Sequence, residues 1–150
     1  MSAFFEKEII LLNVFFNKEQ RKHLIFDFYK SKDIHFHFPE SAVLKDGPSA
    51  GIGIALALIS ELTNRKVCGQ IAMTGEITLH GKVLPIGGLR EKTMAAYKNG
   101  IKKVLFPKGN IPDLTEIDSE VKEVIEFIPV ETIFDVVKHA LLSTEENDGR

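Results

Sequence analysis

The apolar segments of this chain are short, and this limits what it can fold into. The longest ones are interrupted at Asn13, Lys18 and Glu61. None approaches the roughly 18 uninterrupted apolar residues of a membrane-spanning helix. Segments with the period of a strand alternate with segments of helical length. We therefore predict a soluble α+β fold of mixed β-sheet segments between helices. It should form a single compact domain over residues 1–142, followed by a polar, disordered tail over residues 143–150.

Glycine, proline and asparagine mark the ends of most predicted elements. The pattern shows no internal repeat. The first predicted helix is Glu6–His23, and a buried strand over Ile9–Phe16 is the alternative there. We expect helices over Glu6–His23, Ile52–Leu62 (stopped at Asn64), Leu89–Lys98 (capped by Asn99 and Gly100), Val121–Glu126 and Thr132–Leu142. We expect strands over Asp33–Phe38, Ile71–Met73, Lys82–Ile86, Val104–Phe106 and Phe127–Val130.

Composition narrows the choice of partners and compartment. The 150 residues are 44% hydrophobic, enough for one core, and carry a formal net charge of -2. Without an excess of Lys and Arg, a nucleic-acid partner is not expected. The short apolar segments argue against a membrane in the same way. Cys68 lies in an apolar stretch, where we expect a buried free thiol. A reducing compartment fits best, so we expect the cytoplasm, with a mitochondrial or other organelle matrix as the alternative.

Ser49 is the first residue that points to chemistry. It lies in the loop Lys45–Gly51, directly before an apolar helix, and therefore at a helix N-terminus. A serine hydroxyl is a weak nucleophile that needs a nearby base, and unpaired N–H groups at a helix start can stabilise an oxyanion. Gly47 and Gly51 would leave space for a substrate backbone. A serine that only caps the helix is the alternative.

Lys92 is the candidate base. Gly87 and Gly88 open the helix Leu89–Lys98, so Lys92 falls in its first turn. A lysine can act as a base if its amine is neutral, and burial and a helix N-terminus both oppose positive charge. Arg90 cannot take this role, because a guanidinium does not lose its proton in a protein. From the residues alone, a surface lysine remains the alternative.

Four segments together carry a resemblance to a known family. They are Asp33–Glu40 (DIHFHFPE), Lys45–Gly51 (KDGPSAG), Met73–Leu79 (MTGEITL) and Leu84–Lys92 (LPIGGLREK). In this order they resemble the signature blocks of the proteolytic domain of Lon proteases. The similarity extends from about Glu6 to about Leu142.

The resemblance implies a serine-type endopeptidase domain of an ATP-dependent protease that degrades unfolded or misfolded proteins. Ser49 matches the family's nucleophile and Lys92 its base, forming a Ser-Lys dyad. Thr74 matches a threonine that can hydrogen-bond the lysine amine, and Asp46 a residue that shapes the loop or occludes the dyad. His35 and His37 match histidines that would support the site without acting as the base. The loop that would bind the substrate and stabilise the oxyanion consists of Gly47, Pro48, Ala50 and Gly51.

Partners and cofactors are also implied only by the resemblance. Unfolded proteins or peptides would be the substrates, and the domain would assemble into a hexameric ring. No cofactor is expected in this chain, whereas ATP and magnesium would serve an ATPase module that the family normally has on the same polypeptide. The chain departs from the family's pattern at Ser41, Leu44 and Arg90, none of which belongs to the dyad.

Two other functions stay open at this point. Gly47–Gly51 also satisfies Gly-x-Ser-x-Gly, the nucleophile elbow of α/β-hydrolases, and Asp135 and His139 follow in the right order for a triad of a serine esterase. The domain could instead be a catalytically silent assembly domain with a Lon-like fold. His35 and His37 could contact a metal, but no third ligand is indicated, so we expect no metal site.

Overall fold

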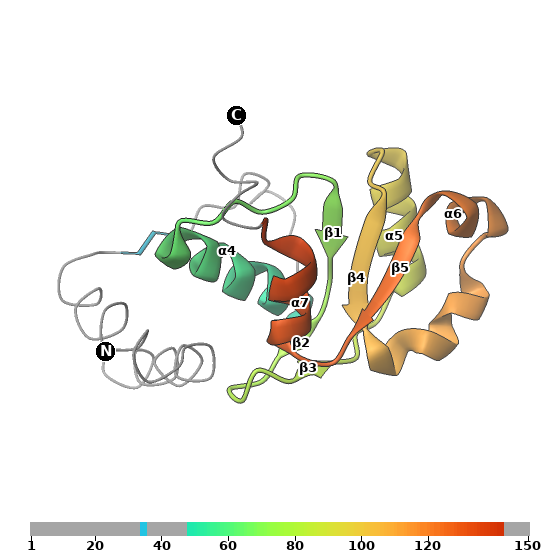
Figure 1. Cartoon of the computed structure of the whole chain (residues 1–150). Coiled ribbons are helices and arrows are strands. Elements are labelled where there is room, and N and C mark those ends of the chain that lie inside the picture. Colours follow the sequence, from blue (N-terminus) through green and yellow to red (C-terminus); the bar gives the residue numbers. More distant parts are fainter. Residues whose placement is uncertain (1–33, 36–47, 143–150) are drawn as a thin grey trace. The chain divides into compact units, whose positions relative to one another are not determined.

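A computed structural model of the chain describes residues 34–35 and 48–142 (Figure 1). Within residues 48–142 the order of elements is η1 (Pro48–Ala50), α4 (Gly51–Thr63), β1 (Ile71–Met73), β2 (Glu76–Ile77), β3 (Val83–Leu84), α5 (Leu89–Lys98), β4 (Lys103–Pro107), η2 (Lys108–Glu116), α6 (Ser119–Val124), β5 (Glu126–Val130) and α7 (Ile133–Ala140). This is the α+β fold that the sequence predicts.

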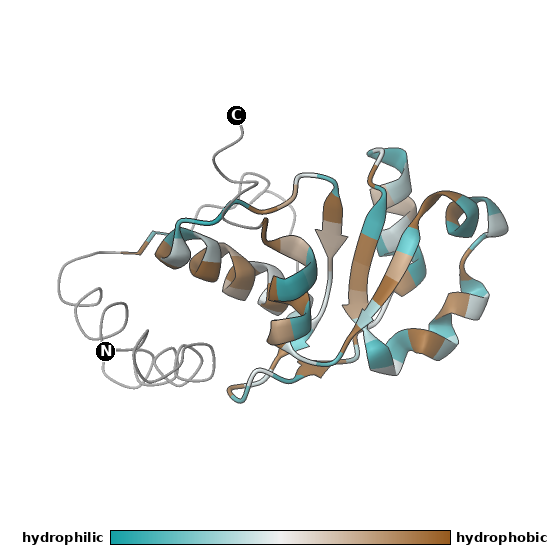
Figure 2. Cartoon of the chain, in the orientation of Figure 1, coloured by the Kyte–Doolittle hydropathy of each residue, from teal (hydrophilic) through white to brown (hydrophobic). Residues whose placement is uncertain are grey.

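A parallel sheet of three strands, in the order β1-β4-β5, forms the centre of this part. Parallel strands need crossover connections, and these are supplied by α5 between β1 and β4 and by α6 between β4 and β5. β4, the middle strand, is buried from Val104 to Pro107, as expected for a strand covered on both faces. In Figure 2 it changes from hydrophilic at its start to hydrophobic along its length.

Helices cover both faces of the sheet. α4 and α7 lie together on one side and α5 and α6 on the other (Figure 1). The second side holds a continuous cluster of buried side chains, namely Leu89, Ala96, Val104, Phe106, Ile117, Val121 and Ile125. On the first side α7 buries Ile133, Val136 and Ala140, which share one face of the helix.

A short antiparallel hairpin of β2 and β3 follows β1 and joins the start of α7. Val83 N–H donates to the Glu131 carbonyl, and Ile133 N–H donates to the carbonyl of Gly81. These bonds hold the hairpin against the C-terminal end of β5. The segment between β1 and α5 is therefore anchored to the rest of the domain.

Most predicted elements within the described residues are confirmed. Helices occur at Gly51–Thr63, with Asn64 in the left-handed conformation as its end, and at Leu89–Lys98. The predicted strand Lys82–Ile86 is reduced to Val83–Leu84, because only these residues pair with β2. Glu126, predicted in a helix, instead begins β5, where it pairs with Lys103. The 3₁₀ segment η2 was not predicted.

Some predictions lie partly or wholly outside the described residues. These are the helix over Glu6–His23, the tail over 143–150 and most of the strand over Asp33–Phe38, of which only Ile34 and His35 are described. Both are exposed, and neither belongs to a strand. The division into one domain and a tail stays a prediction. No helix in the part described has the length and hydropathy to cross a membrane.

Cys68 differs from its prediction. Its thiol is free but only half-buried. The reason is its place after α4, in the connection to β1, where its backbone N–H donates to the Ala140 carbonyl at the end of α7.

Candidate active site

Ser49 lies in the single 3₁₀ turn η1, which runs directly into α4. The segment after β1 holds this turn from the side. Gly75 N–H donates to the Ser49 carbonyl (2.9 Å), and Ile52 N–H donates to the Gly75 carbonyl (3.1 Å). The Thr74 hydroxyl donates to the same Ser49 carbonyl over 3.3 Å. The backbone of Ser49 is therefore held at a helix N-terminus, as the sequence predicts.

Gly51 allows the start of α4 to approach the hairpin. A Cβ atom at Gly51 would lie 3.0 Å from Cγ2 of Ile77 and 3.1 Å from its backbone nitrogen. β2 thus takes the space beside this glycine. The expectation that Gly51 leaves space for a substrate backbone stays a prediction.

Lys92 is held by the turn that begins its own helix. Gly88, the N-cap of α5, has a φ of 69°, the left-handed conformation that favours glycine. The Lys92 backbone N–H donates to the Gly88 carbonyl over 3.2 Å. Its side chain turns back along the helix, and Nζ donates to the carbonyl of Gly87 over 2.8 Å. The predicted position in the first helical turn is confirmed.

One cavity of about 240 Å³ brings these residues together. It is lined by Ser49, Ala50, Ala72, Met73, Thr74, Lys92, Ala96 and Val104. Ala96 and Val104 are buried and the serine and lysine half-buried, so small apolar side chains form its floor. The two helix N-termini that carry Ser49 and Lys92 therefore open onto the same space.

The polar groups of the cavity have partners other than each other. Among the described residues, no hydrogen bond joins the Ser49 hydroxyl to the Lys92 amine. Thr74 contacts the Ser49 carbonyl and Lys92 contacts Gly87, so the Thr74–Lys92 bond implied by the resemblance is not made here. Hydrogen bonds of catalytic groups are often long or absent in structures without substrate.

Other residues singled out from the sequence are placed as follows. Pro48 and Ala50 flank Ser49 and are exposed. His35 is exposed, while His37, Asp46 and Gly47 lie outside the described residues. Within residues 34–35 and 48–142, no three His, Cys, Asp or Glu side chains come close enough to hold a metal ion.

Comparison with known proteins decides the family. Residues 6–143 match the family model described as the Lon protease (S16) C-terminal proteolytic domain. The chain belongs to the Lon protease family. It is 58% identical over 122 residues to the Lon protease of Clostridioides difficile, an alignment that covers 81% of this chain and 16% of that protein. It is 62% identical over 107 residues to the Lon protease of Mesomycoplasma hyopneumoniae, covering 71% of this chain and 12% of the relative.

The chain thus spans less than a fifth of these relatives, whose alignments cover 16% and 12% of their length. The part it matches is the proteolytic domain of Lon proteases. The family also explains why the sequence resembles its signature blocks at Ser49 and Lys92.

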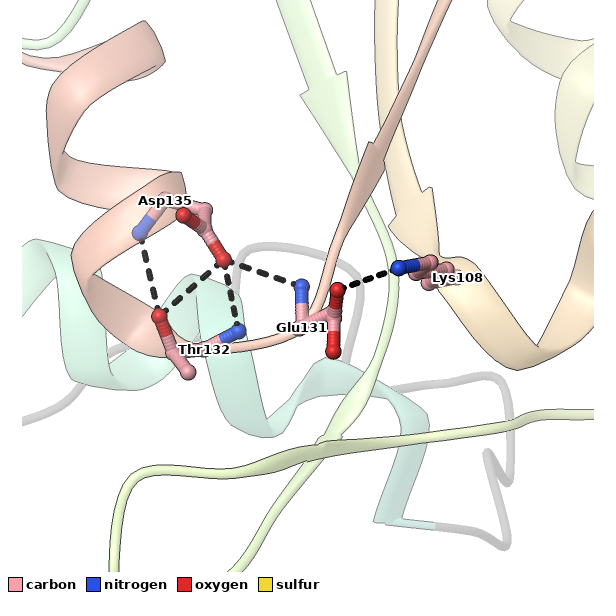
Figure 3. A network of polar contacts seen from close by, with 4 residues as sticks. All are labelled: Lys108, Glu131, Thr132 and Asp135. Atoms are coloured by element: carbon pink, nitrogen blue, oxygen red, sulfur yellow. Dashed lines mark hydrogen bonds and ion pairs between the residues drawn. The ribbon is translucent and has the colours of Figure 1, made fainter.

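Membership of the Lon family removes the α/β-hydrolase alternative, and the structure supplies the physical reason. Asp135 does not orient a histidine, because it caps α7. Its carboxylate accepts hydrogen bonds from Thr132 N–H (2.9 Å), Glu131 N–H (3.0 Å) and the Thr132 hydroxyl (3.0 Å), as Figure 3 shows. His139 is exposed at the other end of α7 and does not line the cavity.

The cap also shifts the acidity of Asp135. Partial burial would raise the pKa of this carboxyl. Hydrogen bonds from the Thr132 and Glu131 backbone and from the Thr132 hydroxyl, together with the charge of the nearby His139, outweigh burial, so the pKa lies below its ordinary value. Glu131 itself forms an exposed ion pair with Lys108 (Figure 3). This network therefore stabilises the start of α7 and does not line the cavity.

One residue that contacts the segment before α5 was not singled out from the sequence. Asn110 is only 4% exposed and bonds with both polar groups of the Ile86 backbone, immediately before Gly87. It lies in η2, and nothing in the local sequence indicates its partner. The available signal was a polar residue with an acidic residue, Asp113, three positions later in a segment between two apolar elements.

Proposed function

We propose that this domain is a serine endopeptidase in which Ser49 is the nucleophile and Lys92 the general base. The observation that carries the proposal is their shared cavity: both line one small, mainly apolar space, and each lies at the start of a helix. Membership of the Lon protease family supports the same assignment.

The proposed reaction begins with a proton transfer. Neutral Lys92 takes the hydroxyl proton of Ser49 while the serine oxygen forms a bond to the peptide carbonyl carbon. The tetrahedral intermediate then collapses, the carbon–nitrogen bond breaks, and Lys92 returns the proton to the leaving amine. Water attacks the acyl-enzyme with Lys92 again accepting a proton, and Ser49 recovers it when the acid is released.

Two features of the structure suit this sequence of steps. A neutral amine keeps two N–H donors and one lone pair, so the contact with the Gly87 carbonyl leaves the lone pair for the serine proton. N–H groups at the start of a helix lack acceptors within it, and in this mechanism those beside Ser49 would stabilise the oxyanion. Ala50, next to the nucleophile, belongs to the same cavity wall.

A broader role follows as part of this proposal. In a longer polypeptide the domain would degrade unfolded or misfolded proteins delivered by an ATPase module that uses ATP and magnesium. It would act in a hexameric ring and in the cytoplasm or an organelle matrix. Membership of the Lon protease family supports this role.

The experiment is cleavage of casein, an unstructured protein, by the wild-type chain beside Ser49→Ala and Lys92→Ala, without ATP and over a pH series. Circular dichroism and thermal unfolding show whether each variant is folded. We expect cleavage by the wild-type chain and none by either variant. Activity that survives in folded Lys92→Ala would overturn the assignment of the base. A folded but inactive wild-type chain would favour the assembly domain.

A further inference from the structure

The side chain of Asn110 forms hydrogen bonds with both polar groups of the Ile86 backbone. Its side-chain oxygen accepts a hydrogen bond from Ile86 N–H over 3.0 Å, and its amide nitrogen donates to the Ile86 carbonyl over 2.8 Å. An amide side chain offers an acceptor and a donor side by side, whereas an ionised carboxylate offers acceptors only. The two hydrogen bonds join η2 to a segment 24 residues earlier in the chain.

The orientation of this amide is set within η2. Asp113 Oδ2 accepts a second hydrogen bond from the Asn110 nitrogen over 2.6 Å, which identifies the donor end of the amide. Asn110 is 4% exposed, so water does not compete for these contacts. Because a buried amide without partners would cost stability, the full set of bonds holds the side chain in one position.

The neighbouring residue brings the two segments into close contact. A Cβ atom on Gly109 would lie 2.5 Å from Cγ of Pro85, nearer than real Cβ contacts occur. Glycine at this position therefore lets η2 pack directly against Pro85. Packing at Gly109 and hydrogen bonding at Asn110 together fix the chain just before the glycine pair.

The next carbonyl in this segment holds the Lys92 amine. Gly87 follows Ile86 directly, and its carbonyl accepts the 2.8 Å hydrogen bond from Nζ. The two hydrogen bonds hold the peptide planes on either side of Ile86, and the second of these planes ends at Gly87. This limits the movement of the Gly87 carbonyl, although two glycines in succession would otherwise be very mobile. The position of the Lys92 amine in the cavity thus depends on a buried amide of η2 that does not line it.

We propose that Asn110 is a positioning residue for the general base: it fixes Ile86, and through the Gly87 carbonyl it holds the Lys92 amine in place for Ser49. This inference rests on the proposed function, since it assumes that Lys92 is the base. In this view Asn110 of η2 helps to position the Lys92 amine, in addition to the packing of η2 in the core.

The test compares Asn110→Ala with Leu114→Ala, both in η2. Leu114 packs against the buried cluster around α5, and its side chain forms none of the hydrogen bonds that Asn110 makes with Ile86, so its variant reports a loss of packing. Asp113→Ala is a milder second variant that removes only the orienting bond. Wild type, Ser49→Ala and Lys92→Ala complete the set, and thermal unfolding shows that each is folded.

Two readouts separate positioning from stability. The first is the dependence of kcat and KM on pH with a fluorogenic peptide. The second is the rate at which an acylating reagent modifies the Lys92 amine, read by mass spectrometry and divided by the rate at Lys98, an exposed lysine of the same helix. This ratio can be measured even in a variant that has no catalytic activity.

We expect Asn110→Ala to lower kcat by about tenfold or more with KM changed less than about twofold, since small misplacement of a catalytic group has large effects. The ascending limb of its pH profile should move, and the ratio of Lys92 to Lys98 modification should rise. Asp113→Ala should show the same pattern more weakly, and Leu114→Ala should retain the wild-type kcat, pH profile and ratio.

An unchanged modification ratio in folded Asn110→Ala or Asp113→Ala would overturn the inference, as would equal kcat losses in Asn110→Ala and Leu114→Ala. Activity retained by folded Lys92→Ala would contradict the proposed function instead, while the modification ratio would still decide whether Asn110 positions the amine.

Discussion

The hydroxyl of Thr74 donates a hydrogen bond to the carbonyl oxygen of Ser49, over 3.3 Å, from the residue that directly follows β1. Thr74 is 6% exposed, and its backbone N–H donates to the Leu105 carbonyl of β4. The turn that carries the nucleophile is thereby connected to the central sheet. The contact of the Thr74 hydroxyl is thus with Ser49, and the bond to the Lys92 amine that the resemblance implies stays a prediction.

Replacement of Thr74 should therefore affect the serine turn. Thr74→Val keeps the shape of the side chain but removes the hydroxyl, and we expect kcat/KM for a peptide to fall by about tenfold. Thr74→Ser keeps the hydroxyl and should lose much less. Steady-state kinetics measures both, and equal activity in the two variants would show that the bond to the Ser49 carbonyl is irrelevant to catalysis.

The pH dependence of cleavage tests the base. A lysine amine must lose its proton before it can accept one from Ser49, so cleavage should become faster as the pH is raised. Lys92→Arg is a matched variant that keeps the positive charge but does not deprotonate. We expect it to be inactive over the whole pH series. A flat profile for the wild-type chain would argue against Lys92 as the base.

Asp135 should make the stability of the domain depend on pH. Because its folded pKa is lowered, its contribution is present above the unfolded value of about 3.8 and is lost as the pH falls through the folded value. Asp135→Asn should lower the free energy of unfolding by about 1 kcal/mol at neutral pH. The difference from wild type should shrink as the pH drops below about 3.8.

A control for this prediction is Asp118→Asn. Asp118 forms an exposed ion pair with Arg90 at 3.0 Å and accepts no capping bond at the start of α6. Exposed pairs contribute about 0–1 kcal/mol, so this variant should change stability less than Asp135→Asn does. Urea unfolding at several pH values measures both. A constant difference between Asp135→Asn and wild type across the acid range would contradict the prediction.

The glycine pair before α5 provides a comparison of neighbouring positions. Gly88 has a φ of +69°, whereas Gly87 has no atom within 4 Å of the position where a Cβ would lie. Gly88→Ala should lower the free energy of unfolding by about 1–2 kcal/mol, because the left-handed conformation is strained for alanine. Gly87→Ala should cost less than about 0.5 kcal/mol. Thermal unfolding of both variants measures these changes. Equal losses of stability would show that the left-handed conformation of Gly88 is not the reason for the cost.

The sequence predicted the regular elements well where their signals are local. The helices that begin after Ser49 and after Gly88 were predicted within one residue of their observed bounds, because turn residues and apolar periodicity lie in the same stretch of chain. The 3₁₀ segment η2 was missed, since it contains Pro112 and has no simple period. Its shape depends on Asn110 and the distant Ile86.

By itself, then, the sequence determined the fold class, the resemblance to Lon proteases and the placement of Ser49 and Lys92 at two helix starts. Each of these depends on residues that are neighbours in the chain. Only the tertiary structure decided that both helix starts open onto one cavity, that Thr74 contacts Ser49, and that Asn110 clamps the segment before Gly87. These contacts join elements far apart in the chain, and their geometry follows from how β1, α5 and η2 pack around β4.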